Sequence, residues 1–169
     1  DIDPSRFIAA KNTAKEFVDN LPLGSYVGII GFSGDATVYQ DLTTDKIKVK
    51  AGIDNLDFGK VEGTNIYNAI LAADKLFDNN EADKLRSVIL ISDGQINTGE
   101  APQIISFSER NRILINTIGI GSPEGGLGQY NTIMKADVDF LKSLSFNSGG
   151  TFFRIEEIGR STRLNSSHS

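Results

Sequence analysis

RSVILISDG, residues Arg86 to Gly94, decides how this chain folds. Its apolar centre, VILI, is continuous instead of alternating, which is typical of a strand buried on both faces of a parallel sheet. The run ends at Asp93-Gly94, a pair that favours a turn. A carboxylate directly after a buried strand predicts a position at the carboxyl edge of such a sheet, where α/β folds bind their ligands.

Further strands surround this one in the sequence. Tyr26–Phe32 (YVGIIGF), Arg112–Ile120 and Thr151–Ile155 are apolar in the same way. Residues 36–42 (ATVYQDL) alternate in polarity, and the turn Ser33-Gly34-Asp35 joins them to the preceding strand as a hairpin. Helical patterns separate the strands. The sequence therefore predicts an α/β, doubly wound, mostly parallel sheet with one antiparallel edge hairpin.

The helices are predicted from apolar spacing and from capping residues. Asp3 caps the first helix, which begins at Pro4, and another helix starts near Pro102. Three further helices are expected. Thr44 caps one of them, which has Ile47, Ala51 and Leu56 on its apolar face, and Thr64 opens the next. Asp137 caps the last helix, whose inward residues are Val138, Leu141 and Leu144, and Gly149 follows its end.

Composition narrows the possible functions. The net charge of −5 argues against a nucleic-acid partner, and no apolar run approaches the roughly 20 residues that span a bilayer. Residues 1–157 are expected to form the domain. Residues 158–169 (IGRSTRLNSSHS) are polar and serine-rich, and we set them apart as an artefactual or disordered tail. The chain begins at Asp1, and we expect it to be a fragment of a longer protein.

The ligand-forming side chains of residues 1–157 are nearly all oxygen donors. The chain has no cysteine, and its one histidine, His168, lies in the tail. Serine-histidine triads, thiolate chemistry and cysteine- or histidine-bound zinc are therefore excluded from this part. Oxygen ligands suit hard cations such as Mg²⁺ or Mn²⁺.

Two residues are candidates for a cation site, and each has an ordinary alternative. Asp93 could bind a metal or only cap a turn, and Thr64 in EGTN could bind a cation or only cap a helix. Gly119-Ile120-Gly121 lacks the third glycine of a dinucleotide fingerprint. The sequence GFSGD around Ser33 departs from the G-x-S-x-G elbow, so Ser33 is interpreted as a hairpin-turn residue.

Taken in order, several stretches resemble the von Willebrand factor A domain, and most closely the bacterial domains of the aerotolerance-operon and magnesium-chelatase-associated kind. These stretches are RFIAAKNTAKEFVDNL, GSYVGIIGFSGDA, EGTNIYNAI, RSVILISDGQINTG, RILINTIGIGS and DVDFLKSLSFNSGGTFFR. The resemblance covers about residues 1–155 and implies a metal-ion-dependent adhesion site. Thr64 resembles its threonine and Asp93 its aspartate, with Mg²⁺ or Mn²⁺ between them and a carboxylate of a partner protein completing the shell.

The resemblance also implies an incomplete site. The family's D-x-S-x-S motif, on the first and central strand, is absent. Its loss is expected to weaken Mg²⁺ binding, to leave a gap between Tyr26–Phe32 and Arg86–Ser92, and to make the domain marginally stable.

The function expected from the resemblance is a non-catalytic binding module, with a parent protein anchored in a bacterial membrane. A second hypothesis is a subunit domain that docks to an AAA+ motor of the chelatase kind. A third is an α/β hydrolase or phosphotransferase with Asp93 as nucleophile, although no Lys or Arg is obviously placed for a phosphate.

Overall fold

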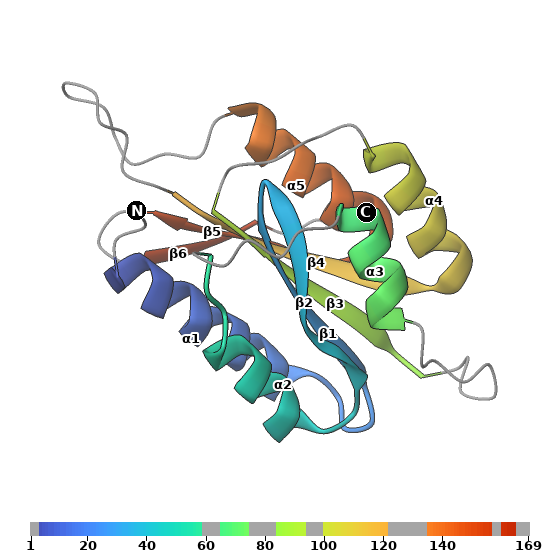
Figure 1. Ribbon diagram of the computed structural model, residues 1–169, viewed down its shortest axis with the longest axis horizontal. Coiled ribbons are helices and arrows are strands. Elements are labelled where there is room, and N and C mark those ends of the chain that lie inside the picture. Colours follow the sequence, from blue (N-terminus) through green and yellow to red (C-terminus); the bar gives the residue numbers. More distant parts are fainter. Residues whose placement is uncertain are drawn as a thin grey trace.

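The computed structural model describes residues 4–58, 65–74, 84–93, 100–121, 135–156 and 160–164. These residues form one sheet with helices on both faces, which confirms the predicted α/β class (Figure 1). In chain order the elements are α1 (Pro4–Asn20), β1 (Tyr26–Ser33), β2 (Asp35–Thr43), α2 (Lys46–Asp54), α3 (Ile66–Asp74), β3 (Arg86–Ser92), α4 (Ala101–Asn111), β4 (Ile113–Ile120), α5 (Lys135–Ser148), β5 (Phe152–Glu156) and β6 (Arg160–Leu164).

The strands lie in the order β2-β1-β3-β4-β5-β6. β1, β3, β4 and β5 are parallel, and β2 pairs antiparallel with β1 as the predicted edge hairpin. At the other edge β6 pairs antiparallel with β5. Residues 160–164 of this edge strand belong to the stretch 158–169 that the sequence sets apart as a tail.

The expected gap between the two apolar strands is not present. β1 pairs directly with β3 in continuous parallel register, from Tyr26 opposite Arg86 to Phe32 opposite Ser92. Both strands are apolar runs of similar length, and a buried backbone N–H or C=O needs a hydrogen-bond partner. Closing the two strands on each other satisfies these groups, so the prediction of an open central gap was wrong. The expectation of marginal stability rested on that gap.

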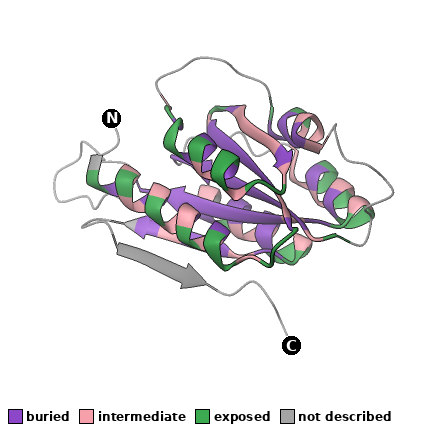
Figure 2. Cartoon of the chain, turned by 90° about the horizontal axis from the view of Figure 1, so that it is seen from below, coloured by how far each residue is buried: buried purple, intermediate pink, exposed green. Residues whose placement is uncertain are grey.

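Alternate residues of the strands pack on the two helical layers. In β3, Val88 and Leu90 contact the core beneath α3, α4 and α5, whereas Ile89 and Ile91 contact the core beneath α1 and α2. All four side chains are fully buried. Figure 2 shows these buried strands between helices whose outer faces are exposed. The continuous VILI run is therefore explained by burial on both faces.

Helix α2 turns a different face inward than its spacing predicted. Its buried residues are Val49, Gly52 and Ile53. Ile47 is 81% exposed. Gly52 packs so closely on β2 that a Cβ there would lie 2.9 Å from Cβ of Gln40. Of the predicted stripe, Leu56 is buried just beyond the helix, whereas Ile47 and Ala51 are exposed. The prediction was wrong for these two residues, because the close contact of Gly52 with β2 turns Val49 and Ile53 inward instead.

Three helix starts also differ from the sequence prediction. α3 begins at Ile66, and the side chain of Asn65, not of Thr64, accepts the hydrogen bond from the backbone N–H of Asn68 at 2.7 Å. Asp45, not Thr44, caps α2, because its side chain accepts hydrogen bonds from the backbone N–H of Ile47 at 3.0 Å and of Lys48 at 3.3 Å. Asp137 lies in the first turn of α5, which already begins at Lys135. The expected Asp3 cap of α1 falls outside the described residues.

The remaining predictions for α5 are confirmed. Val138, Leu141 and Leu144 are buried, and Gly149 follows the helix with φ 84°. This left-handed conformation is typical of the residue that ends a helix.

Candidate functional site

Ser33 and Asp93 meet where β1 and β3 end. The parallel register puts Phe32 opposite Ser92, so the next residue of each strand lies at the same edge of the sheet. The backbone N–H of Asp93 donates to the carbonyl of Phe32 at 3.3 Å. The Ser33 hydroxyl donates to Oδ2 of Asp93 at 2.6 Å. A buried carboxylate, 6% exposed, is thus fixed at the carboxyl edge, where the sequence predicted it.

Asp137 adds a second carboxylate to this edge. It is half-buried in the first turn of α5. Burial raises the pKa of Asp137 above its ordinary value, and the negative charge of Asp93 raises it further. A cation or a hydrogen-bond donor placed beside Asp137 would stabilise its charged form. The sequence pattern predicts only a capping role for Asp137, and it does not reveal the electrostatic effect of Asp93 on this residue.

Arg6 closes the same edge from the side of α1. The residue is 2% exposed, and its Nη1 donates to the carbonyl of Gly121, just beyond β4, at 2.8 Å. The Nε atom of Arg6 is buried without a hydrogen-bond partner. The start of α1 is therefore held against the end of β4 by a buried guanidinium group.

A small pocket of about 40 Å³ lies beside these residues. It is lined by Phe32, Gly34, Asp35, Asn65, Ile66, Glu100 and Ile104. Oε2 of Glu100 is buried without a hydrogen-bond partner, and Oδ1 of Asn65 accepts from the backbone N–H of Asn68 at 2.7 Å. The pocket is thus bordered by the hairpin of β1 and β2 and by the starts of α3 and α4, and its polar lining is mainly acidic.

The predicted site residues have different outcomes. Asp93 lies at the predicted strand end, whereas Thr64 lies outside the described residues, so its distance from Asp93 stays a prediction. The sequence pattern predicts only a turn position for Ser33. Its position at a strand end equivalent to that of Asp93 is the signal that could have identified it. In the described ranges, no group of three or more Asp, Glu, His or Cys residues could hold a metal ion.

Known proteins with similar sequences identify the family of this chain. A family model described as "von Willebrand factor type A domain" matches residues 1–95. A "UPF0353 protein" of Nocardia farcinica is 27% identical over 97% of this chain and 56% of its own length. One from Mycolicibacterium vanbaalenii is also 27% identical, over 94% of this chain and 51% of its own. The chain therefore spans about half the length of the curated relatives it matches.

Solved structures share the fold. "Conserved hypothetical protein BatB" from Bacteroides thetaiotaomicron has a TM-score of 0.63 at 22% identity, over 92% of this chain and 82% of that one. "Proximal thread matrix protein 1" from the mussel byssus, described with a "zinc occupied MIDAS motif", has a TM-score of 0.59 at 18% identity, over 99% of this chain and 44% of that one. None of the helices in the described ranges is long and apolar enough to cross a membrane.

Proposed function

Because the chain belongs to the von Willebrand factor type A domain family, we propose that it is part of a cation-dependent protein-binding module and not an enzyme. The observation that carries the proposal is the buried carboxylate of Asp93, fixed by Ser33 at the carboxyl edge of the sheet. A ligand crevice at this edge is expected in any open α/β sheet.

The side chains at this edge are of the chemical type that binds hard cations. Asp93 and Asp137 provide carboxylates, Ser33 provides a hydroxyl, and the chain has no cysteine. Oxygen donors of this type suit Mg²⁺ or Mn²⁺. In number they are fewer than a tight site requires, because among the described residues no three Asp, Glu, His or Cys side chains are gathered closely enough to hold a metal ion. Asp93 is the primary ligand in this proposal, and Thr64 joins it on the strength of the family resemblance.

The charge at this edge explains why binding would depend on a cation. Asp93 and Asp137 present negative charge together, and Asp35 and Glu100 border the adjacent pocket. A partner protein that offers a carboxylate is repelled by such an edge. A bound divalent cation would reverse the sign of the local potential and accept the partner's carboxylate as a ligand.

The comparisons support the same proposal. The mussel protein with the shared fold is described with an occupied adhesion-site motif. A second similar structure, from Bacteroides fragilis, is described as an "aerotolerance-related membrane protein" and has a TM-score of 0.63 at 22% identity. We propose by analogy that the longer protein around this domain is held at a bacterial membrane and uses the domain to recruit an acidic partner.

A catalytic role is less consistent with this edge. Residues 1–157 contain neither histidine nor cysteine, and these are the most common general base and a frequent nucleophile of enzymes. The partner that orients Asp93 is a serine hydroxyl. Asp93 is thus held as an acceptor at the end of a strand, which suits a ligand of a cation.

The test uses a fluorescent glutamate-rich peptide as the acidic probe. Anisotropy is measured with the whole chain in millimolar Mg²⁺ or Mn²⁺ and again with EDTA. We expect binding only with the cation, and loss of binding in Asp93→Ala. Asp139→Ala is the matched control, because Asp139 is exposed on α5. Binding that persists in EDTA, or that Asp93→Ala leaves unchanged, would overturn the proposal.

A further inference from the structure

The small pocket at the carboxyl edge combines an apolar floor with an acidic rim. The buried residues that line it are apolar, namely Phe32, Ile66 and Ile104. The side chains that line it closer to the surface are polar, namely Asp35, Asn65 and Glu100. None of the described residues that line the pocket is a lysine or an arginine. The pocket therefore carries negative charge that no basic side chain of its own lining offsets.

Glu100 contributes a carboxylate oxygen that lacks a hydrogen-bond donor. Oε2 of Glu100 is buried and has no partner. The residue lies at the N-cap position of α4, but its side chain makes no capping hydrogen bond to that helix. A buried acceptor without a donor is unfavourable, and most such oxygens in proteins are paired. A ligand that donates a hydrogen bond in this pocket would supply the missing partner.

Two more acceptors complete the rim. Oδ1 of Asn65 accepts from the backbone N–H of Asn68 at 2.7 Å, which holds the side chain at the start of α3. An amide oxygen has two lone pairs, so it can accept a second hydrogen bond. Asp35, the first residue of β2, adds an exposed carboxylate. The rim thus offers oxygen acceptors from three separate segments of the chain.

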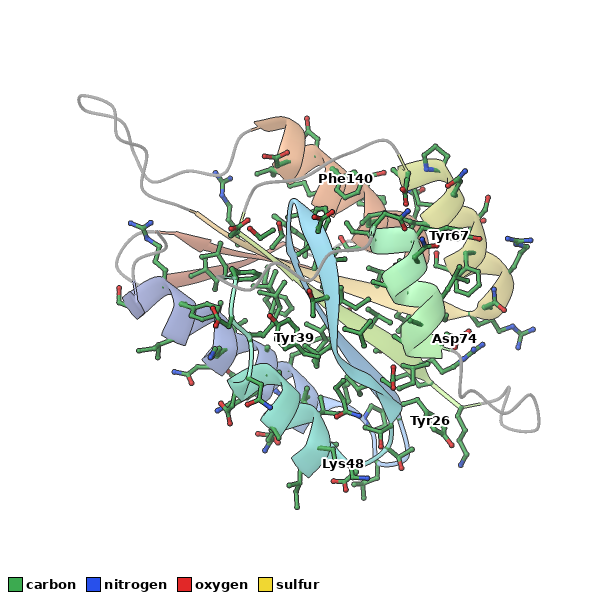
Figure 3. All side chains as sticks on the ribbon, viewed as in Figure 1. Tyr26, Tyr39, Lys48, Tyr67, Asp74 and Phe140 are labelled. Atoms are coloured by element: carbon green, nitrogen blue, oxygen red, sulfur yellow. The ribbon has the colours of Figure 1, made fainter. Side chains whose placement is uncertain are left out.

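The helices on two sides of the pocket are packed against each other. Tyr67 of α3, labelled in Figure 3, lies edge to face on Phe107 of α4, with ring centroids 5.9 Å apart. The floor residues Phe32, Ile66 and Ile104 belong to one hydrophobic core. The core of the domain therefore fixes the shape of the pocket before any ligand arrives, as is usual for binding sites.

We propose that this pocket binds a primary ammonium group, carried by a lysine side chain of the partner protein. An ammonium has three donors and no acceptor, which matches the acceptors of Asp35, Asn65 and Glu100. The methylene stem of a lysine packs on apolar surface while its charged end stays at the polar rim. The pocket volume is about 40 Å³, and one water molecule needs roughly 10–15 Å³. The ammonium and the last methylenes of a lysine therefore fit.

The proposal rests on the cation-dependent binding proposed above and specifies its partner further. Phe32 and Gly34 line the pocket, and they flank Ser33, whose hydroxyl is bonded to Asp93. The pocket and the proposed cation site are thus neighbours. A partner that engages both presents a lysine close to the carboxylate that binds the cation. An acidic partner without the lysine would leave Glu100 unpaired, which makes the pocket a determinant of specificity.

Two other occupants fit the pocket less well. A divalent cation requires more ligands, and among the described residues no three Asp, Glu, His or Cys side chains are grouped to hold one. An arginine guanidinium is a wide, planar group with five donors in a fixed fork, whereas an ammonium is compact. The volume of about 40 Å³ favours the compact group.

The first experiment tests the pocket alone, in metal-free buffer. Butylammonium chloride is titrated into the whole chain, butanol is the uncharged counterpart, and NMR follows the amide chemical shifts. We expect saturable shifts at Gly34, Asn65 and Glu100 with butylammonium only, and their loss in Glu100→Gln. Glu109→Gln, at an exposed position on α4, is the matched control and should bind as the unaltered chain does. Absence of saturable shifts, or equal shifts with butanol, would overturn the proposal.

The second experiment places the ammonium beside a carboxylate. Two fluorescent glutamate-rich peptides are compared by anisotropy in millimolar Mg²⁺, one with a central lysine and one with norleucine, which has a similar stem without the ammonium. We expect the lysine peptide to bind roughly tenfold more tightly, because a charged hydrogen-bonded contact is gained. Glu100→Gln should remove this advantage and Glu109→Gln should keep it, with circular dichroism confirming that each variant is folded.

The two experiments separate this proposal from the cation-dependent function. Equal affinity of the two peptides for the unaltered chain would overturn the lysine contact, even if both peptides require Mg²⁺. Butylammonium binding that Glu100→Gln abolishes, without binding of either peptide in Mg²⁺, would support the ammonium site and overturn the cation-dependent function.

Discussion

The hydroxyl of Ser33 donates to Oδ2 of Asp93 at 2.6 Å, and this hydrogen bond joins the ends of two parallel strands that lie 60 residues apart in sequence. The bond depends on the direct pairing of β1 with β3. It fixes a buried carboxylate in one orientation at the carboxyl edge. Any ligand that engages Asp93 therefore meets a group that is already ordered.

Ser33→Ala is expected to destabilise the fold by about 1–2 kcal/mol, because a buried carboxylate loses a hydrogen bond. Urea denaturation followed by circular dichroism measures the change. Ser106→Ala, at an exposed position on α4, is the control and should change the free energy of unfolding by less than about 0.5 kcal/mol. Equal effects of the two substitutions would show that the hydrogen bond contributes nothing.

Mg²⁺ is expected to bind this chain weakly, with a Kd of about 1 mM or above, because few carboxylates converge on the site. Calorimetric titration of the chain measures the affinity, and Asp93→Ala should remove it. Micromolar binding that Thr64→Ala or Asp93→Ala abolishes would contradict the expectation and would show that the site is complete.

Asp137→Asn is expected to stabilise the fold at neutral pH, with a rise in Tm of about 1–2 °C. The pKa of Asp137 is raised above its ordinary 3.8 by burial and then by Asp93. The folded state therefore holds a proton more tightly than the unfolded state, and stability falls as the pH rises through the raised pKa. Thermal melts from pH 3 to pH 7 should show the advantage of the variant at pH 7 and its disappearance below the ordinary pKa. A difference independent of pH would contradict this cause.

Arg86 and Asp74 form an ion pair at 3.1 Å, with side chains 5% and 14% exposed. Burial raises the pKa of Asp74 more than the charge of Arg86 lowers it, so the pair does not fully offset the cost of burial. Asp74→Ala is expected to cost about 3 kcal/mol, because it leaves the guanidinium buried without its carboxylate. The double variant Asp74→Leu/Arg86→Met should cost much less. Chemical denaturation of both variants tests this, and a double variant as unstable as the single one would refute it.

Gly150→Ala is expected to cost at least about 3 kcal/mol or to prevent folding. A Cβ there would lie 2.1 Å from the carbonyl oxygen of Ile115, and both are backbone positions with little freedom to move. Gly24→Ala is the comparison. Gly24 has φ 85° with no atom within 4 Å of its added Cβ, so only the backbone conformation is strained, at about 1 kcal/mol. Melting temperatures of the two variants should differ in this order.

The sequence patterns predicted the helices and strands more accurately than they predicted how these pack against each other. The continuous VILI run of β3 and the inward face of α5 were predictable, because burial on a layer imposes a period on the side chains. The rotation of α2 was not predictable from spacing, since Ile47 and Val49 both begin apolar pairs four residues apart. The rotation of α2 is set by the close contact between Gly52 and strand β2.

The site was predictable only in part, for a related reason. Asp93 could be located because a buried strand must end at an edge of the sheet. Its link to Ser33 could not, because the resemblance placed another strand between β1 and β3, and the structure pairs the two directly. The order of the strands in the sheet depends on which backbone N–H and C=O groups of distant segments form hydrogen bonds with each other, and the local sequence does not determine this. The place of Thr64 beside Asp93 stays a prediction.

The direct pairing of β1 with β3 has a consequence for how the chain reaches its fold. Each paired residue of β1 lies 60 positions before its partner in β3, as Tyr26 does before Arg86. The chain between the two strands must therefore close into a long loop before the pair can form, and the entropy of that loop is lost before the contacts compensate for it. The parallel pairs are for this reason expected to form late in folding, whereas the hairpin of β1 and β2, whose contacts are local, can form early.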